Sequence, residues 1–285
     1  MIPKFDYFRP KTTEELVNLL AKYGEDAKMF VGGTDLLVLM RDKLIRPKYV
    51  IDLKGIEELH EFSYDEKRGL RIGATVTLNE LLESDVVKER FGVLWSAAGA
   101  LADPTIRNRG TLVGNICNAS PAADTAPALL VLDAEVEVAG KGGERTIPIR
   151  DFFMDVKRTS LKPEEFVKAV RIPNPPAGAK GGYYKWGRTR GEDLAVVGVA
   201  ALVVNSGKRI VRVALSSVFK TPLRVPEVEK VFEEEGPLDE QIERAVSVVQ
   251  EKIAPITDVR GGKEYRLHMA GVLTRRALKE LFGGS

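Results

Sequence analysis

Residues 104–134 read PTIRNRGTLVGNICNASPAADTAPALLVLDA, a polar, glycine-containing stretch between two apolar runs. Gly110 and Gly114 permit close backbone approach or a positive φ. The carboxylate of Asp124 opens a predicted helix, and the stretch supplies four short hydrogen-bonding side chains: Thr111, Asn115, Asn118 and Ser120. This composition suits a loop that holds a charged, hydroxylated ligand. It is equally typical of a turn between a strand and a helix, so the stretch alone leaves both interpretations open.

A second glycine turn lies nearer the N-terminus. The apolar strand predicted at 28–31 breaks at GGTD (32–35), and a helix is predicted at 36–44. A strand, a glycine turn and a helix in this order point backbone N–H groups at an anion. Thr34 or Asp35 would equally serve as an ordinary helix N-cap, as would Asp124 in its own helix. Both the Rossmann spacing G-x-G-x-x-G and the P-loop pattern are absent. We predict that the two turns face each other and clamp a pyrophosphate, with Asp124 accepting hydrogen bonds from ribose hydroxyls.

The charge balance disfavours nucleic-acid and membrane-surface roles. The chain has 43 Lys and Arg against 41 Asp and Glu, without a long run of one sign. Its longest apolar run, residues 194–204, is too short to cross a bilayer and contains a glycine. The first residues, MIPKFDYFRP, lack the apolar segment of a signal peptide. We therefore expect a cytoplasmic protein with no membrane span and no nucleic-acid partner.

Cysteine and histidine are scarce. Cys117 is the single cysteine, so this chain alone cannot ligate an iron–sulfur cluster through cysteines. The two histidines, His60 and His268, leave little material for a metal site, and neither lies in a nucleophile motif. We expect no metal ligands and no catalytic side chain for substrate oxidation on this chain.

Periodicity and capping signals predict three structural units joined by short loops and by a linker at 173–182. Helices are predicted at 12–24, 36–44, 77–84, 85–102, 124–132, 226–235, 238–253 and 265–282, and strands at 28–31, 49–53, 70–75, 134–140, 144–149, 166–172, 194–204 and 209–218. The strands at 134–149 should form a hairpin. Those on either side of Asn205-Ser206-Gly207-Lys208 should pair as antiparallel neighbours.

Three motifs resemble the FAD-binding medium subunit of the molybdenum hydroxylases, the family of carbon monoxide dehydrogenases, xanthine dehydrogenases and aldehyde oxidoreductases. They are VGGTDLL (31–37), TIRNRGTLVGNICNASPAADTAPALL (105–130) and KWGRTRGEDLAVVGVA (185–200). The resemblance extends over the whole chain, including the ending EYRLHMAGVLTRRAL. The second family motif usually reads T-[IV]-G-G-N, and here Val113 replaces its first glycine and restricts φ. We expect this loop to bind the cofactor nonetheless.

The resemblance implies an α+β fold, in which a two-subdomain FAD-binding module of the vanillyl-alcohol-oxidase type precedes a small antiparallel sheet with helices. The implied ranges are 1–56 and 57–175 for the two FAD-binding subdomains and 180–285 for the C-terminal domain. It places Asp124 at the adenosine ribose, Val167 at adenine and Lys185 near the flavin ring. The full set of implied FAD contacts is Val31, Gly32, Gly33, Thr34, Asp35, Leu36, Leu101, Ile106, Thr111, Leu112, Val113, Gly114, Asn115, Asp124, Val167 and Lys185.

The family role would be that of an electron-transfer subunit. FAD would receive electrons from a small [2Fe-2S] subunit and pass them to NAD, oxygen, a quinone or a protein, while a large molybdenum–pterin subunit oxidises the substrate. Lys185 would favour the anionic reduced ring. Arg188 and Arg190 would be its neighbours, or would form a solvated basic face beside Glu192 and Asp193. The alternatives are a self-contained FAD-dependent reductase or oxidase of the same wider fold, and a non-catalytic nucleotide-binding protein.

Overall fold

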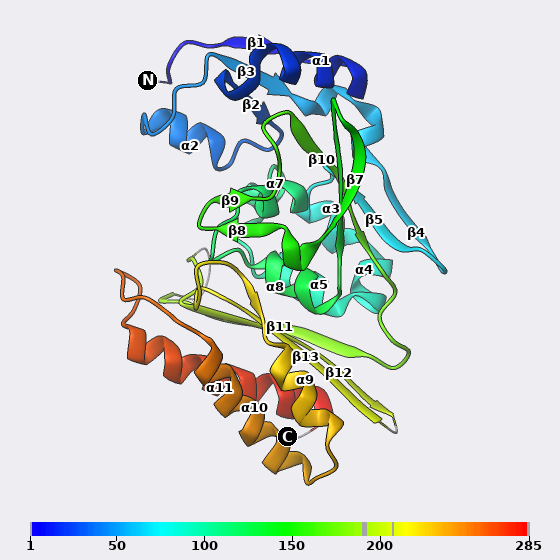
Figure 1. Cartoon of the computed structure of the whole chain (residues 1–285), viewed down its shortest axis with the longest axis vertical. Helices are drawn as coiled ribbons and strands as arrows, with labels where there is room; N and C mark the ends of the chain where they lie inside the picture. Colours follow the sequence, from blue (N-terminus) through cyan, green and yellow to red (C-terminus); the bar gives the residue numbers. More distant parts are fainter. Residues whose placement is uncertain (1, 190–192, 207, 284–285) are drawn as a thin grey trace.

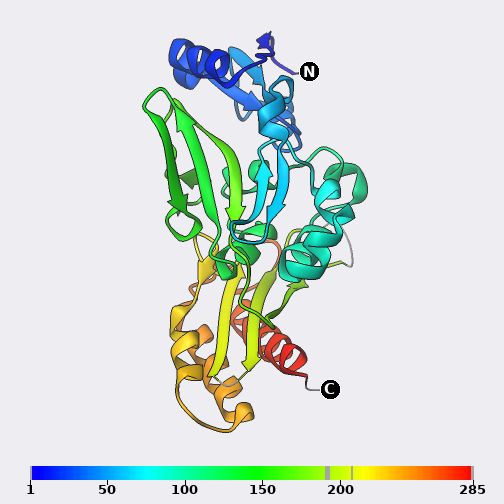
Figure 2. The same cartoon turned by 90° about the vertical axis from the view of Figure 1, so that its right-hand side faces the viewer.

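Three sheets lie one after another along the long axis of the molecule (Figures 1 and 2). The computed structural model describes residues 2–189, 193–206 and 208–283. The N-terminus lies at one end of the long axis, and the C-terminus lies in the part formed by the last sheet and its helices (Figure 2). The mixture of parallel and antiparallel sheets with interspersed helices agrees with the predicted α+β class.

The first sheet is parallel, with strand order β1-β3-β2. Thr12 caps the helix that follows it, because its hydroxyl accepts the N–H of Glu15, and Leu16 and Leu20 bury the inner face of that helix. The elements are β1 (Asp6–Phe8), α1 (Thr13–Tyr23), η1 (Gly24–Asp26), β2 (Ala27–Phe30), α2 (Leu36–Arg41), β3 (Tyr49–Asp52), η2 (Leu53–Gly55) and η3 (Glu57–His60). Because β2 and β3 are parallel, their carboxyl ends lie at the same edge of the sheet.

The second sheet is antiparallel, with order β4-β5-β10-β6-β7. The predicted hairpin at 134–149 is confirmed as β6 paired with β7. The strands are β4 (Phe62–Asp65), β5 (Gly69–Gly73), β6 (Glu135–Gly140), β7 (Gly143–Pro148) and β10 (Glu165–Ile172), and η4 (Ile149–Asp151) leads to the small pair β8 (Phe153–Asp155) and β9 (Arg158–Thr159). Six helices lie between β5 and β6 in the chain: α3 (Leu78–Glu83), α4 (Asp85–Arg90), α5 (Gly92–Gly99), α6 (Pro104–Arg107), α7 (Leu112–Cys117) and α8 (Thr125–Val131).

The third sheet is antiparallel, with order β11-β12-β13-β14. The predicted pairing of its two long strands is confirmed, and Gly207 of the predicted turn lies outside the described residues. The elements are β11 (Lys180–Trp186), β12 (Val197–Ser206), β13 (Lys208–Ser216), β14 (Leu223–Arg224), α9 (Pro226–Glu233), α10 (Leu238–Lys252) and α11 (Lys263–Phe282).

Strand β12 explains the longest apolar run in the sequence. Val197, Val199 and Ala201 face the core shared with α9, α10 and α11, whereas Ala200 and Leu202 face the core shared with the second sheet. Helices α5 and α8 contact this sheet from one side, and α11 contacts it from the other (Figure 1). A strand buried on both faces has no polar alternation, so its sequence reads as a continuous hydrophobic run.

Candidate functional site

The two glycine turns of the sequence meet in space. A Cβ atom on Gly32 would lie 2.0 Å from the carbonyl oxygen of Arg109, so only glycine allows the two backbones to approach this closely. Gly33 has a φ of +74°, a conformation that side chains other than glycine rarely adopt. The loop after β2 therefore packs directly against the loop between α6 and α7.

Side chains also tie the loop after β2 to the C-terminal end of α7. The amide nitrogen of Asn118 donates to Oδ1 of Asp35 at 2.8 Å, and the amide oxygen of Asn118 accepts from the Lys157 ammonium at 2.8 Å. Asp35 precedes α2, yet its side chain makes no capping hydrogen bond. Asp35 therefore occupies the N-cap position of α2 without capping it through its side chain, and its carboxylate instead bonds Asn118 at the end of α7.

Residues 111–115 form the first turn of α7 rather than an extended loop. The Thr111 hydroxyl accepts the N–H of Gly114 at 2.9 Å and thereby caps the helix. The side chains of Leu112 and Val113 are buried in the core, so these two residues present backbone rather than side chain to the loop junction. Val113 lies inside the helix and its φ is not positive, so valine needs no strained conformation there. The amide oxygen of Asn115 accepts from the Thr125 hydroxyl at 2.6 Å, which joins α7 to α8.

Asp124 and Lys185 meet in a buried cluster beside these loops. Oδ2 of Asp124 lies 2.9 Å from Nζ of Lys185, which also donates to the carbonyl oxygen of Ala100 at 2.9 Å. Oδ1 of Asp124 accepts the Tyr183 hydroxyl at 2.7 Å. Burial raises the pKa of Asp124, and the charge of Lys185 together with the two hydrogen bonds opposes that rise. Asp124 occupies the N-cap position of α8, and its side chain likewise makes no capping hydrogen bond.

This contact joins two residues to which the resemblance gives different roles, Asp124 at the adenosine ribose and Lys185 near the flavin ring. In this structure their charged groups are hydrogen-bonded to each other. Both assignments stay predictions.

The remaining apolar candidates have different environments. Ile106 is 38% exposed, so it is not a core residue. Leu101 is half-buried against the first core, and its carbonyl accepts a hydrogen bond from Arg107. Val167 lies on β10 next to a register shift between β10 and β6, and its side chain is buried in the core. Any ligand contact from Val167 would have to involve its backbone unless the surrounding side chains move.

A cavity of about 410 Å³ opens beside the junction of the two loops. Its lining contains Val31 from the first loop, Arg109 from the second, and polar residues absent from the predicted set: Lys54, Glu57, His60, Thr75, Thr77 and Asn108. The Lys54 ammonium donates to the carbonyl of Val31 at 2.8 Å and lies 4.0 Å from the Phe30 ring centroid. In parallel sheets, ligands commonly bind just beyond the carboxyl ends of the strands. Lys54 follows β3, whose carboxyl end lies beside that of β2, so this rule could have indicated Lys54.

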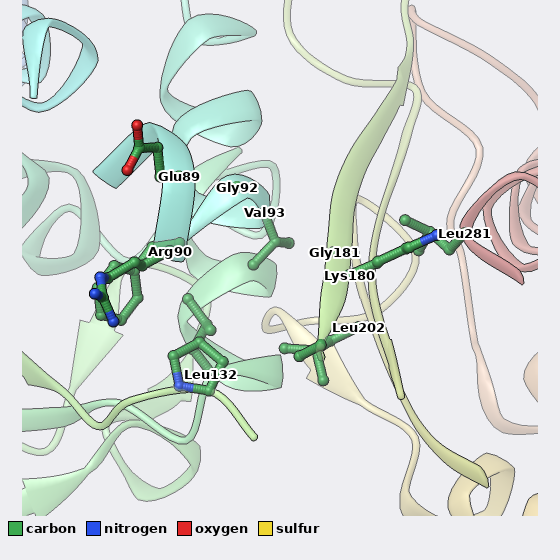
Figure 3. Close-up of a pocket in the computed structure, with 12 residues that line it drawn as sticks. Glu89, Arg90, Gly92, Val93, Leu132, Lys180, Gly181, Leu202 and Leu281 are labelled. Atoms are coloured by element: carbon green, nitrogen blue, oxygen red, sulfur yellow. The ribbon is translucent and has the colours of Figure 1, made fainter. Parts of the chain in front are cut away.

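Another cavity, of about 290 Å³, lies between the α4–α5 region and β11 (Figure 3). Val93, Leu132 and Leu202 contribute apolar side chains to it, and Arg90 and Lys180 contribute charged ones. None of the residues that line it belongs to the predicted cofactor set.

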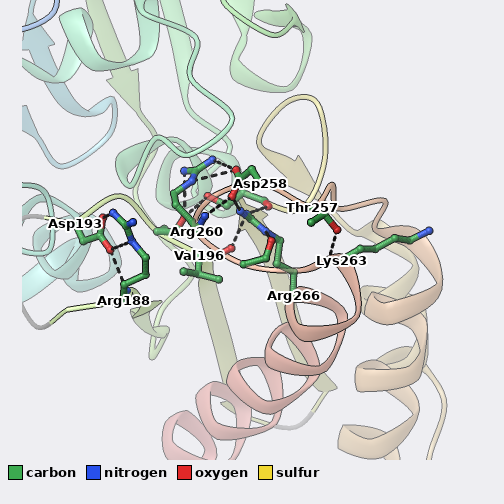
Figure 4. A network of polar contacts seen from close by, with 11 residues as sticks. Arg188, Asp193, Val196, Thr257, Asp258, Arg260, Lys263 and Arg266 are labelled. Atoms are coloured by element: carbon green, nitrogen blue, oxygen red, sulfur yellow. Dashed lines mark hydrogen bonds and ion pairs between the residues drawn. The ribbon is translucent and has the colours of Figure 1, made fainter.

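Arg188, the first basic residue after Lys185, forms a surface ion pair. Nε of Arg188 lies 2.9 Å from Asp193, and this hydrogen-bonded guanidinium lowers the pKa of Asp193 to about 2 (Figure 4). Arg190 and Glu192 lie outside the described residues. Trp186 donates to the Tyr265 hydroxyl at 2.8 Å, and Tyr184 packs against the core of the third sheet. The exposed ion pair of Arg188 with Asp193 agrees with the alternative in which Arg188 belongs to a solvated basic face.

Two family models together match nearly the whole chain. "FAD binding domain in molybdopterin dehydrogenase" matches residues 3–175, and "CO dehydrogenase flavoprotein C-terminal domain" matches residues 182–281. The chain belongs to the FAD-binding medium subunits of the molybdenum hydroxylases. It is therefore the flavin subunit of an oxidoreductase complex, and the family predicted from the sequence is confirmed.

Individual relatives agree over almost their full lengths. The carbon monoxide dehydrogenase medium chain of Afipia carboxidovorans is 34% identical over 98% of this chain and 97% of its own. The xanthine dehydrogenase FAD-binding subunit of Escherichia coli O157:H7 is 31% identical over 96% of this chain and 94% of its own. A solved carbon monoxide dehydrogenase chain from Hydrogenophaga pseudoflava superposes with a TM-score of 0.95 at 33% identity, covering 99% of this chain and 98% of that one. This superposition confirms the predicted fold.

Burial raises the pKa of the Cys117 thiol to about 12, so this thiol is un-ionised at neutral pH.

Within residues 2–189, 193–206 and 208–283, no cluster of three His, Cys, Asp or Glu side chains could hold a metal ion. None of the described helices is long and apolar enough to cross a membrane.

Proposed function

We propose that this chain holds FAD across the junction of its two glycine loops and carries electrons from an iron–sulfur partner subunit to an external acceptor. The observation that carries the proposal is the contact of Gly32 with Arg109, with the Asp124–Lys185 pair nearby. FAD supplies the chemistry of exchanging electrons singly and in pairs. The protein would bind the cofactor, place a positive charge near the flavin ring and control access to that ring.

The loop junction fits a pyrophosphate. The first loop, residues 31–36, and the turn at 111–115 bring glycine and backbone groups together where bulkier residues would separate them. The N–H groups of Leu112 and Val113 precede the first intrahelical donor of α7, so helix geometry leaves them without an intrahelical partner. Backbone donors of this kind are suited to phosphate oxygens.

The two ends of the cofactor would occupy different surroundings. The cavity of about 410 Å³ is within the usual size range of small-molecule sites, and we assign the adenosine end to it. Lys185 was predicted near the flavin ring, and its contact with Asp124 brings that carboxylate to the same end. A Lys–Asp pair keeps the local charge balanced, while the ammonium still offers a positive charge to an electron-rich ring.

The complex is inferred from the relatives. Those from Afipia carboxidovorans and Escherichia coli are named as a medium chain and as an FAD-binding subunit, and the solved Hydrogenophaga pseudoflava enzyme is described as a carbon monoxide dehydrogenase that lacks the Mo-pyranopterin moiety of the molybdenum cofactor. We propose a large molybdenum–pterin subunit and a small [2Fe-2S] subunit as partners, with NAD, oxygen, a quinone or a protein as acceptor. We also propose that 1–56, 57–175 and 180–285 are separate structural units, because each contains one of the three larger sheets.

The first experiment measures cofactor content. The purified chain is expected to show oxidised-flavin absorption and to bind about one FAD per chain after reconstitution, without molybdenum or iron. The complex from its native host is expected to contain all three, and a substrate of the complex should reduce the flavin. A colourless chain that cannot be reconstituted would contradict FAD binding. A flavoprotein from the native host that lacks molybdenum and iron would favour the self-contained enzyme.

Asp124→Asn is expected to weaken FAD binding by about 10- to 100-fold. A hydrogen bond to a charged group contributes about 1.5–3 kcal/mol, which corresponds to that range of affinity. The measurement is the Kd of FAD by fluorescence titration of the apoprotein. Asp133→Asn is the matched control, because Asp133 is also ion-paired, to Arg212 and Arg224, but lies beyond the other end of α8. Equal affinities of the two variants would contradict a role for Asp124 in FAD binding.

A further inference from the structure

Strand β11 delivers two side chains to the same carboxylate. Tyr183 and Lys185 are two residues apart, so they project from the same face of the strand, and both contact Asp124. Tyr184 lies between them and projects to the opposite face, where its hydroxyl interacts with Glu280 of α11. The sequence motif around Lys185 did not indicate Tyr183.

The hydroxyl of Tyr183 occupies a position built by three other elements. It lies 2.7 Å from Oδ1 of Asp124, next to α8, and 3.3 Å from the Ser216 hydroxyl on β13. A Cβ atom on Gly198 of β12 would lie 2.1 Å from the same hydroxyl and 2.4 Å from that of Ser216. The absence of a side chain at Gly198 therefore makes room for the hydroxyl, and all these residues are buried or lack a side chain.

We propose that Tyr183 is a positioning residue of the FAD site, which fixes the Asp124 carboxylate so that its other oxygen holds the Lys185 ammonium. This inference rests on the proposed function, because it assigns the Asp124–Lys185 pair to FAD. Tyr183 acts through Asp124 and not by touching the cofactor. Without the tyrosine hydroxyl, the carboxylate could rotate, and Lys185 would lose its fixed anchor.

The hydrogen bond also affects the ionisation of Asp124. Burial raises the pKa of Asp124, while the charge and hydrogen bond of Lys185 and the hydrogen bond of Tyr183 lower it. Among the described residues, Lys185 and Tyr183 are the titratable groups that contact this carboxylate, and Ser216 contributes a hydroxyl beside Tyr183. Loss of the Tyr183 hydroxyl therefore raises the pKa of Asp124 further, and the carboxylate becomes protonated at a higher pH.

Tyr183→Phe removes only the hydroxyl and preserves the ring. We expect the Kd of FAD at neutral pH to rise about 10-fold, because a hydrogen bond to a charged group is lost. We also expect the midpoint pH of FAD release on acidification to rise by about one unit, which is the equivalent of about 1.4 kcal/mol. Tyr184→Phe is the matched control, since it removes the neighbouring hydroxyl from the opposite face of the same strand. It should leave both quantities unchanged.

A double-mutant cycle with Asp124→Asn separates positioning from packing. If Tyr183 acts through the carboxylate, Tyr183→Phe should change the Kd by less than about 2-fold in the Asp124→Asn background. A 10-fold effect in that background would overturn the inference, as would an unchanged Kd and midpoint pH in the single variant. Either of these two outcomes would overturn the role of Tyr183 and leave the proposed function intact, as long as the wild-type chain binds FAD. A wild-type chain that cannot bind FAD would overturn both.

Discussion

Gly32→Ala is expected to abolish measurable FAD binding and to destabilise the first two sheets against each other. The new Cβ would lie 2.0 Å from the Arg109 carbonyl oxygen and 2.6 Å from its carbonyl carbon, both of which are backbone atoms that cannot rotate away. Overpacking of this kind costs about 1–3 kcal/mol. In the proposed FAD site, separation of the loops would also remove hydrogen bonds to the pyrophosphate, and losing two of them weakens FAD binding by about 100-fold or more.

The control for this variant is Gly142→Ala. A Cβ at Gly142 meets no atom within 4 Å, and its φ is not positive, so this substitution should change neither the melting temperature nor the FAD content. Flavin absorbance per chain and thermal unfolding measure both effects. Normal FAD content in Gly32→Ala would show that the cofactor does not depend on the close approach of the two loops.

Arg266→Met should produce the largest loss of stability in the third sheet. Arg266 is 1% exposed and donates to the carbonyl oxygens of Val196 and Ser217 at 2.9 Å and to Asp258 at 2.5 Å (Figure 4). Leaving a buried hydrogen-bond acceptor without its partner costs about 1–3 kcal/mol, and Arg266 is the donor to two carbonyl groups. Asp258 also loses one of its two arginine partners. Urea unfolding followed by circular dichroism measures this loss.

Arg275→Met on the same helix provides the comparison for Arg266→Met. Arg275 pairs with Glu243 at 2.5 Å, but both side chains are exposed, and such pairs contribute about 0–1 kcal/mol. Equally small losses in both variants would contradict the structural role of Arg266. The network of Arg266, Asp258 and Arg260 is distant from the two glycine loops in sequence, so FAD affinity is a useful second readout. We expect it to change less than the stability does.

Local patterns predicted most elements of the fold. The capping pairs Thr12–Glu15 and Thr77–Glu80 begin α1 and α3, and the two predicted antiparallel pairs form with the expected partners. These features depend on residues within a few positions of each other or on the alternation of side chains along a strand. Val113 shows the limit of a motif comparison. Its restricted φ mattered only if the position were a loop, and it lies in a helix.

The candidate site was predicted in part. The two glycine loops were predicted to face each other, and they meet through Gly32 and Arg109. The sequence leaves helix-cap roles open for Thr34, Asp35 and Asp124, and in the structure neither aspartate side chain makes a capping hydrogen bond.

The predicted site lacks Lys54 and Tyr183. Lys54 follows β3 in η2, and its place beyond the carboxyl end of a parallel strand could have indicated it. Tyr183 lies within β11, where no local signal distinguishes it from an ordinary strand residue.

The sequence by itself determined that residues 104–134 combine glycines and short polar side chains with a predicted helix from Asp124, and that a single cysteine cannot ligate a cluster, because both follow from residue types and their spacing. Only the tertiary structure decided what Asp124 contacts. Its partners lie 59 and 61 positions away on β11. A buried carboxylate requires a compensating partner, but which distant side chain supplies it depends on the register and packing of the third sheet against α8. The local sequence places the Asp124 carboxylate at the start of α8, and its partners on β11 reach it only in the folded chain.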